Sequence, residues 1–283
     1  MTSQKASGRI VESLDGFKWY VEEGDDFLVL NDGEMAVREV LYRLAKKERV
    51  FVDVGAHVGE YAIRMAKVYG KVEAFEPNPR SASLLAKNVE LNGVDNITIH
   101  QVACGDAPGE LILYARGGST TPLKIEKHSG IIRAKVVRLD DYLSRVDVVK
   151  IDVEGWEERV VRGMSRLIRD CRPFVVVEHH EYRGYEECRG MRQRIRSLFP
   201  DYYALNLNNV HWLYAPRECD LEEISLAIAL HWINKALKNI QEGRPWYYGF
   251  PLTWWYGADV TDLFLALPRH VTREREWIEL LER

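Results

Sequence analysis

Two groups of acidic and imidazole side chains stand at the ends of strand-like apolar segments. Asp152 and Glu154 follow the segment VVKI, and Glu178, His179 and His180 follow FVVV. Carboxylates and imidazoles are the usual groups that take up or release a proton during a reaction. The carboxyl ends of parallel strands meet at one edge of a sheet, where ligands bind. We therefore expect the two groups to be neighbours and to supply a general base.

Side chains alternate along an extended strand, which separates these candidates. Glu178 and His180 should point the same way, and His179 should point oppositely. We place His179 and His180 first as the base, then Glu154, then Asp152, because imidazole titrates near neutral pH. Alternatively, each histidine bonds to a loop and the two carboxylates cap the next helix. Such a group could also bind a divalent metal, but we favour a site without one.

A tight turn in VFVDVGAHVGEYA forms a second candidate site. Asp53 ends an apolar strand, Gly55 and Gly59 enclose Ala56 and His57, and a helix follows. The spacing DxGxxxG lacks the third glycine of a dinucleotide fingerprint, which disfavours a pyrophosphate. An adenosine that carries an amino acid fits better, with its ammonium on Asp53 and its carboxylate at the helix N-terminus. S-adenosylmethionine has this chemistry.

An acidic residue stands at the end of the next predicted strand. Glu76 follows Gly59 by 17 residues, close to the spacing of about 20 expected for a carboxylate that binds both ribose hydroxyls. The alternative is that these residues only shape turns. Because the turn and the acidic residue are in register, we favour a cofactor site.

The pattern of strands and helices around these residues predicts an α/β fold. Apolar strand-like runs alternate with helical segments from Val50 to His180, which is typical of a mostly parallel sheet with helices on both faces. DYYALNLN and VHWLYAP then predict a C-terminal antiparallel hairpin. We divide the chain into an N-terminal β-hairpin extension (1–34, pairing FKWYVEE with FLVL), a main domain (35–219), and a helical, aromatic-rich extension (220–283).

Composition limits the partners. The 283 residues include 39 basic and 43 acidic side chains, a net charge of −4, so no general positive field would attract nucleic acid. We find no signal peptide and no apolar run long enough to span a membrane. Four cysteines without a CxxC pair are typical of reduced thiols, so we expect the cytoplasm. The aromatic tail should pack on the main domain or on a second copy of the chain.

Several ordered motifs carry a family resemblance. FVDVGAHVGEYA, AFEPNP, NVELN, RLDDYL and especially VKIDVEGWE resemble the FkbM family of S-adenosylmethionine-dependent methyltransferases, over roughly residues 48–180. The resemblance implies a class I (Rossmann-like) methyltransferase fold and methylation of hydroxyl groups on sugars or secondary metabolites. The family more often has Asn where this chain has His57, and either side chain can form hydrogen bonds.

The resemblance also implies roles for single residues. Asp53, Gly55 and Gly59 would hold the methionine part of the cofactor, together with Ala56 and His57 between them. Glu76 would bind the ribose, with Asn78 beside it. The segment QVACGD would border the adenine through Ala103, Cys104 or Asp106, although Cys104 could equally be an apolar wall.

We therefore expect an O-methyltransferase that acts on a carbohydrate or another small hydroxylated metabolite. One alternative is RNA methylation, for which Arg189, Arg192 and Arg196 share a helix face. Against it stand the net acidity and the lack of an NPPY or DPPY sequence. The other alternative is a non-catalytic protein that only binds S-adenosylmethionine.

Overall fold

The computed structural model describes most of the chain up to residue 221. The described residues are 8–22, 34–116, 119–183, 185–208, 210–221, 224, 237 and 240–243. Most of the predicted C-terminal extension therefore lies outside the described residues, as does the predicted strand FLVL. None of the helices in the described part is long and apolar enough to cross a membrane.

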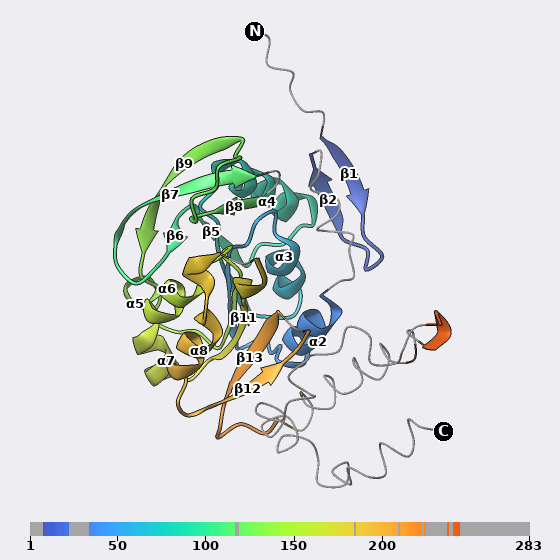
Figure 1. Cartoon of the computed structure of the whole chain (residues 1–283). Coiled ribbons are helices and arrows are strands. Elements are labelled where there is room, and N and C mark those ends of the chain that lie inside the picture. Colours follow the sequence, from blue (N-terminus) through green and yellow to red (C-terminus); the bar gives the residue numbers. More distant parts are fainter. Residues whose placement is uncertain are drawn as a thin grey trace.

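A seven-stranded sheet forms the centre of the molecule (Figure 1). Six of its strands run in one direction, and β13 alone runs antiparallel, to both of its neighbours. This confirms the predicted fold class, a class I sheet with a C-terminal antiparallel hairpin strand. In spatial order the strands are β12 (Tyr202–Asn206), β13 (His211–Pro216), β11 (Phe174–Glu178), β10 (Val148–Ile151), β3 (Val50–Val54), β4 (Lys71–Phe75) and β5 (Ile97–His100).

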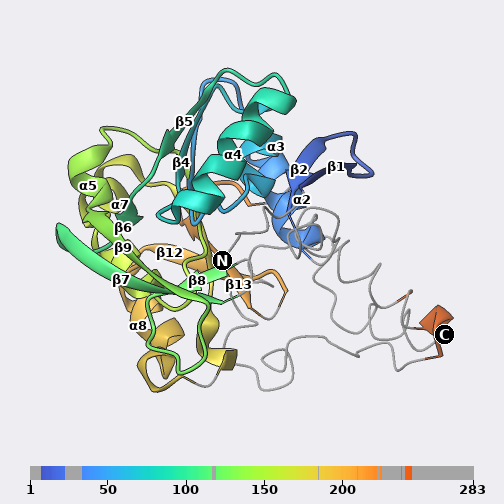
Figure 2. The same ribbon diagram turned by 90° about the horizontal axis from the view of Figure 1, so that it is seen from above.

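Helices cover both faces of this sheet (Figures 1 and 2). Alternate residues of one strand enter different cores: Phe51 packs in the first, and Val52 and Val54 pack in the second. The first core lies under α2 (Met35–Arg43), α3 (Glu60–Ala66) and α4 (Pro79–Leu91). The second lies under α5 (Leu139–Tyr142), α6 (Glu157–Arg162), α7 (Ser165–Cys171) and α8 (Met191–Ser197).

A second, four-stranded sheet is inserted between β5 and β10 along the chain. Its spatial order is β6 (Ala103–Cys104), β9 (Gly130–Val137), β7 (Gly109–Arg116) and β8 (Ser119–Thr121). The strands β7 and β9 flank a long loop. That loop contains β8 at its start, which brings Thr120 and Pro122 to the pocket described below.

The N-terminal residues form a β-hairpin. β2 (Lys18–Val21) pairs with β1 (Arg9–Glu12), which precedes it, through a turn that contains Gly16. FLVL, the partner predicted for FKWYVEE, lies outside the described residues, so that pairing stays a prediction. Arg64 of α3, itself buried, donates to Asp15 at 2.6 Å and stacks on Trp19, which fastens the hairpin to α3.

Two helical regions are interrupted. α6 and α7 are separated at Gly163, where glycine gives the helix little support. Two short 3-10 turns, η1 (His180–Arg183) and η2 (Glu186–Cys188), precede α8, which begins at Met191.

Candidate active site

The predicted turn after β3 has the left-handed backbone that its glycines allow. Gly55 has φ +86° and Gly59, which precedes α3, has φ +97°. A side-chain Cβ on Gly55 would lie only 1.8 Å from the carbonyl oxygen of Asp152. His57 is also left-handed, with φ +49°, which is strained for a residue that has a side chain. The turn is therefore held tightly against the loop that follows β10.

Asp53 is a buried carboxylate at the end of β3. Its side chain is 1% exposed, and neither oxygen makes a hydrogen bond of ordinary geometry to any described residue. Burial raises its pKa to about 6, and Lys150 opposes that rise. A buried anion without hydrogen bonds is costly unless a ligand completes its surroundings.

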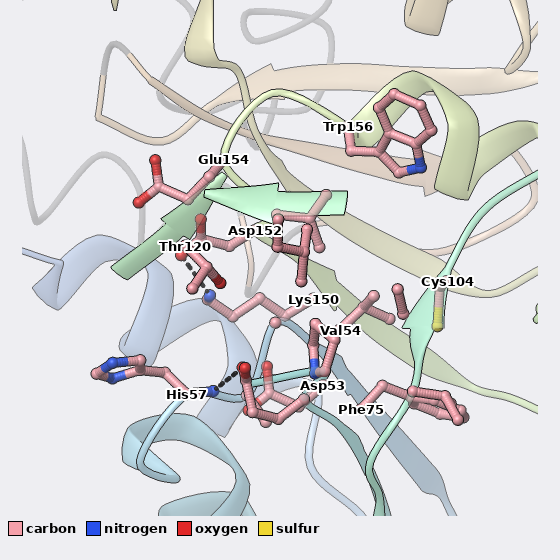
Figure 3. A pocket seen from close by; sticks show the side chains of 18 of the residues that line it. Asp53, Val54, His57, Phe75, Cys104, Thr120, Lys150, Asp152, Glu154 and Trp156 are labelled. Carbon is pink, nitrogen blue, oxygen red and sulfur yellow. Dashed lines mark hydrogen bonds and ion pairs between the residues drawn. The ribbon is translucent and has the colours of Figure 1, made fainter. Parts of the chain in front are cut away.

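Glu76 lies across the turn from Asp53 and holds the backbone of two loops. Its oxygens accept hydrogen bonds from the backbone N–H groups of His57, at 2.9 Å, and Asn78, at 2.8 Å; the first is a dashed line in Figure 3. Burial raises the Glu76 pKa to about 7. The Asn78 side chain instead caps α4 by accepting from the backbone of Arg80.

One end of the pocket is apolar. Phe75 and Cys104 lie together there in Figure 3, and Val102 and Ala103 also line it. Burial raises the pKa of the Cys104 thiol, so Cys104 acts as an uncharged wall. Asp106 is not among the lining residues.

Asp106 instead pairs with an arginine on α6. Its Oδ2 lies 3.0 Å from Arg159 Nη1, and the Arg159 guanidinium stacks on Trp156, which does line the pocket. The structure therefore does not bring Asp106 to the position expected of an acceptor for the adenine amino group.

The other end of the pocket is charged, with Lys150, Asp152 and Glu154 gathered there (Figure 3). Lys150 Nζ lies 3.1 Å from Asp152 Oδ2 and 4.6 Å from the centre of the Tyr61 ring. Burial opposes the charge on Lys150, but Asp152 and Asp53 outweigh it and raise the Lys150 pKa. Burial also opposes ionisation of Asp152, but Lys150 and His180 lower the pKa of Asp152. Both groups therefore stay charged.

His180 lies among carboxylates of the loop after β10, the start of α6 and the end of β11. Its Nδ1 is 2.8 Å from Glu157 Oε1, and its Nε2 is 3.5 Å from Glu154 and from Glu178 and 3.8 Å from Asp152. Burial disfavours the imidazolium, but the bond to Glu157 and the other carboxylates outweigh it and raise the His180 pKa to about 9. His180 is therefore protonated at neutral pH.

Glu157 holds the loop after β10 in place. Its Oε1 also accepts hydrogen bonds from the backbone N–H groups of Val153, at 3.1 Å, and Gly155, at 3.0 Å. Neither Asp152 nor Glu154 caps α6, whose N-cap is Trp156 without a side-chain bond. The alternative interpretation of these carboxylates as helix caps is therefore wrong.

His179 points away from the pocket, as the alternation of strand residues predicts. Its Nε2 lies 3.1 Å from the hydroxyl of Tyr214, and burial lowers its pKa to about 3. The structure thus brings His180, Glu154 and Asp152 together and does not bring His179 to them. The structure therefore does not support His179 as a candidate base equal to His180, because successive residues of a strand face opposite sides.

Sequence reasoning missed several residues of the charged end. Lys150 could have been found, because a lysine inside a continuous apolar strand is a signal of buried charge. Glu34, Glu60 and Tyr61 also line the pocket, and the Tyr61 hydroxyl donates to Glu34. Burial and the neighbouring Glu34 raise the Glu60 pKa to about 8. No local pattern separates these acidic residues from those of a solvated helix.

Comparison with known families gives a match over most of this domain. Residues 53–205, just over half of the chain, match the methyltransferase FkbM domain. The chain belongs to the FkbM methyltransferase family. The matched segment contains the turn, Glu76 and both acidic groups, so the candidate site lies inside the family domain.

Three curated relatives of this FkbM family member are similar at low identity. Methyltransferase 1 of Beauveria bassiana is 30% identical over 162 residues, a match that covers 47% of this chain and 65% of the fungal protein. The 2-O-methyltransferase NoeI of Sinorhizobium fredii is 24% identical, covering 58% and 76% of the two chains. The hexuronic acid methyltransferase AglP of Haloferax volcanii is 30% identical, covering 52% and 63%. The chain thus spans about two thirds of these proteins.

The close approach at Gly55 gives a stability prediction for this FkbM domain. Gly55→Ala should lower the free energy of unfolding by about 4 kcal/mol or more, because the new Cβ must displace the backbone of Asp152. Gly93→Ala is the matched control: Gly93 is also left-handed, with φ +57°, but no atom lies within 4 Å of an added Cβ. It should cost about 1 kcal/mol. Urea denaturation measures both, and equal losses would contradict the packing described here.

Proposed function

We propose that the chain transfers a methyl group from S-adenosylmethionine to a hydroxyl of a carbohydrate or another small metabolite. The observation that carries this proposal is a single pocket with two different ends. One end offers an apolar wall and the Glu76 carboxylate, and the other offers Lys150, Asp152 and Glu154. A nucleoside-containing cofactor fits the first end, and a proton transfer fits the second.

The residues present fit S-adenosylmethionine. We assign the ribose hydroxyls to Glu76, whose carboxylate is buried at the pocket, and the adenine to the wall of Phe75, Val102 and Cys104. We assign the ammonium of the methionine part to Asp53, since its oxygens lack hydrogen bonds to the described residues. When bound, this cofactor supplies an electrophilic methyl group on a positively charged sulfur.

For the proton acceptor we assign Glu154 in place of a histidine. His180 already carries a proton at neutral pH, and the lowered pKa of Asp152 makes it a weak base. Glu154 lines the pocket and lies 3.5 Å from His180 Nε2, which can hold the carboxylate in position. Its backbone is left-handed, with φ +57°, a strain that the surrounding contacts maintain.

Two of the relatives support an oxygen acceptor on a sugar. One is named as a 2-O-methyltransferase and another as a hexuronic acid methyltransferase. The arginines considered for RNA phosphates have contacts within the protein. Arg189 pairs with Glu186, Arg192 stacks on Trp212, and Arg196 donates to the Phe199 carbonyl oxygen.

The raised pKa of Glu76 predicts how nucleoside binding depends on pH. Ribose hydroxyls donate to the ionised carboxylate, which forms as the pH rises through about 7. The affinity for 5′-methylthioadenosine, which has the ribose but no ammonium, should therefore increase between pH 6 and pH 8, by at most about tenfold per pH unit. Titration calorimetry measures this. Glu76→Gln should bind more weakly and lose the pH dependence; an unchanged pH dependence in the variant would exclude Glu76 as its source.

Transfer itself can be tested with methyl-labelled S-adenosylmethionine and fractionated cell extract. We expect label on an oxygen of a carbohydrate or small metabolite, and Glu154→Gln should lower turnover by about 100-fold or more while S-adenosylhomocysteine still binds. Glu110→Gln, an exposed change on β7, is the matched control and should retain both. Label only in RNA would overturn the acceptor class, and full turnover in Glu154→Gln would overturn the assignment of the base.

A further inference from the structure

A second histidine lies behind the charged end of the pocket, on the C-terminal hairpin. His211 begins β13, and its side chain is only 1% exposed. Its Nε2 is aimed at two carboxylates: Glu178 Oε2 at 3.5 Å and Glu34 Oε2 at 3.7 Å. Both distances exceed those of a hydrogen bond, and Nε2 makes none with the described residues.

The other ring nitrogen determines which atom carries the proton. Asn208 Oδ1 accepts from the backbone N–H of His211 at 2.9 Å, which identifies that side-chain atom as oxygen. The same oxygen lies 3.0 Å from His211 Nδ1, so Nδ1 must donate to it. In the neutral imidazole, Nε2 therefore presents a lone pair to two carboxylate oxygens. Such an arrangement is repulsive unless a proton or another positive charge lies between the three groups.

We propose that Glu34, Glu178 and His211 bind one divalent transition-metal ion of the zinc type. One ligand atom from each residue lies within 4.8 Å of the other two. Two ligands of a tetrahedral zinc ion, each at about 2.1 Å, lie about 3.4 Å apart, close to both distances from Nε2. One imidazole with two carboxylates suits Zn²⁺ or Co²⁺ better than Mg²⁺, which prefers oxygen ligands alone.

Groups around the three ligands hold them in the manner usual for metal sites. The His211 Nδ1–H is bound to an amide oxygen, and the Tyr61 hydroxyl donates to Glu34. Glu34 lines the pocket, so an oxygen of water or of the acceptor would complete the coordination. Binding at this place does not require that the chain transfer methyl groups.

A second group, Asp152, Glu178 and His180, shares one member with the proposed site. The two are separated by their histidines, because Glu178 offers Oε1 to His180 and Oε2 to His211. We favour the His211 group because Asp152, a member of the other group, is already paired with the Lys150 ammonium at 3.1 Å. The two candidate sites therefore differ in their histidine: the proposed metal ion is bound by His211 and not by His180.

The test measures binding of Zn²⁺ to chelator-treated full-length protein by titration calorimetry. Wild type should bind one ion per chain, and His211→Gln should weaken binding by about 100-fold or more, whereas His180→Gln and the exposed His128→Gln should not. Glu34→Gln provides a second variant if His211→Gln does not fold. On wild type, Co²⁺ should give the strong visible absorption of a four-coordinate ion.

Three results would overturn the proposal: no binding by wild type, loss of binding in His180→Gln but not in His211→Gln, or equal binding by all variants. S-adenosylhomocysteine binding, measured on the same preparations, reports the proposed function separately. A protein that binds the nucleoside but no metal contradicts the metal site alone, and one that binds metal but no nucleoside contradicts the proposed function alone.

Discussion

The buried ammonium of Lys150 lies beside the carboxylates of Asp53 and Asp152, and the carboxyl edge of the sheet depends on this pairing of opposite charges. Lysine on a central strand is stable there only because its neighbours are anions, and those anions are tolerable only because the lysine is present. Removing one partner would leave uncompensated buried charge. Glu34 adds a further acidic group nearby, whereas burial raises the pKa of Glu60 to about 8 and that of Glu178 to about 9, so these two are mostly uncharged at neutral pH. Asp53, whose oxygens lack hydrogen bonds to the described residues, is therefore the anion suited to a ligand that carries positive charge.

Backbone geometry holds these charges in a fixed arrangement. The turn after β3 and the loop after β10 touch at Gly55, where no side chain fits. Glu76 joins the turn after β3 to the loop after β4 through the N–H groups of His57 and Asn78, and Glu157 holds the loop after β10 through two further N–H groups. Because carboxylates bind both loops, the ligand-binding groups are positioned before any ligand arrives, which lowers the cost of binding.

Much of the fold could be predicted because its signals are local. The alternation of apolar strands and helices predicts the layers, and the order of the glycine turn and Glu76 places them after the ends of neighbouring strands, as observed. The strand β1, which pairs with β2, was not predicted, because its pairing is held by tertiary contacts such as Arg64 with Asp15. The strand period also separated His179 from His180, although it could not rank them.

The rest of the site depends on contacts between distant segments. Glu34 precedes α2 and His211 belongs to the C-terminal hairpin, yet His211 Nε2 lies 3.7 Å from Glu34 and 3.5 Å from Glu178. No residue spacing in a single sequence predicts contacts between segments so far apart. The raised pKa of His180 likewise arises from carboxylates of the β10–α6 segment and of β11, so its protonation could not be anticipated from its residue type.

The central claim, that unsatisfied negative charge at this edge binds a cationic ligand, is tested most directly by the nearly isosteric change Asp53→Asn. Titration calorimetry would compare S-adenosylhomocysteine, which has an ammonium, with 5′-methylthioadenosine, which has none. We predict that the substitution weakens the first by about tenfold or more, or about 1.4 kcal/mol, and leaves the second unchanged. Equal effects on both ligands, or no effect on either, would contradict the account.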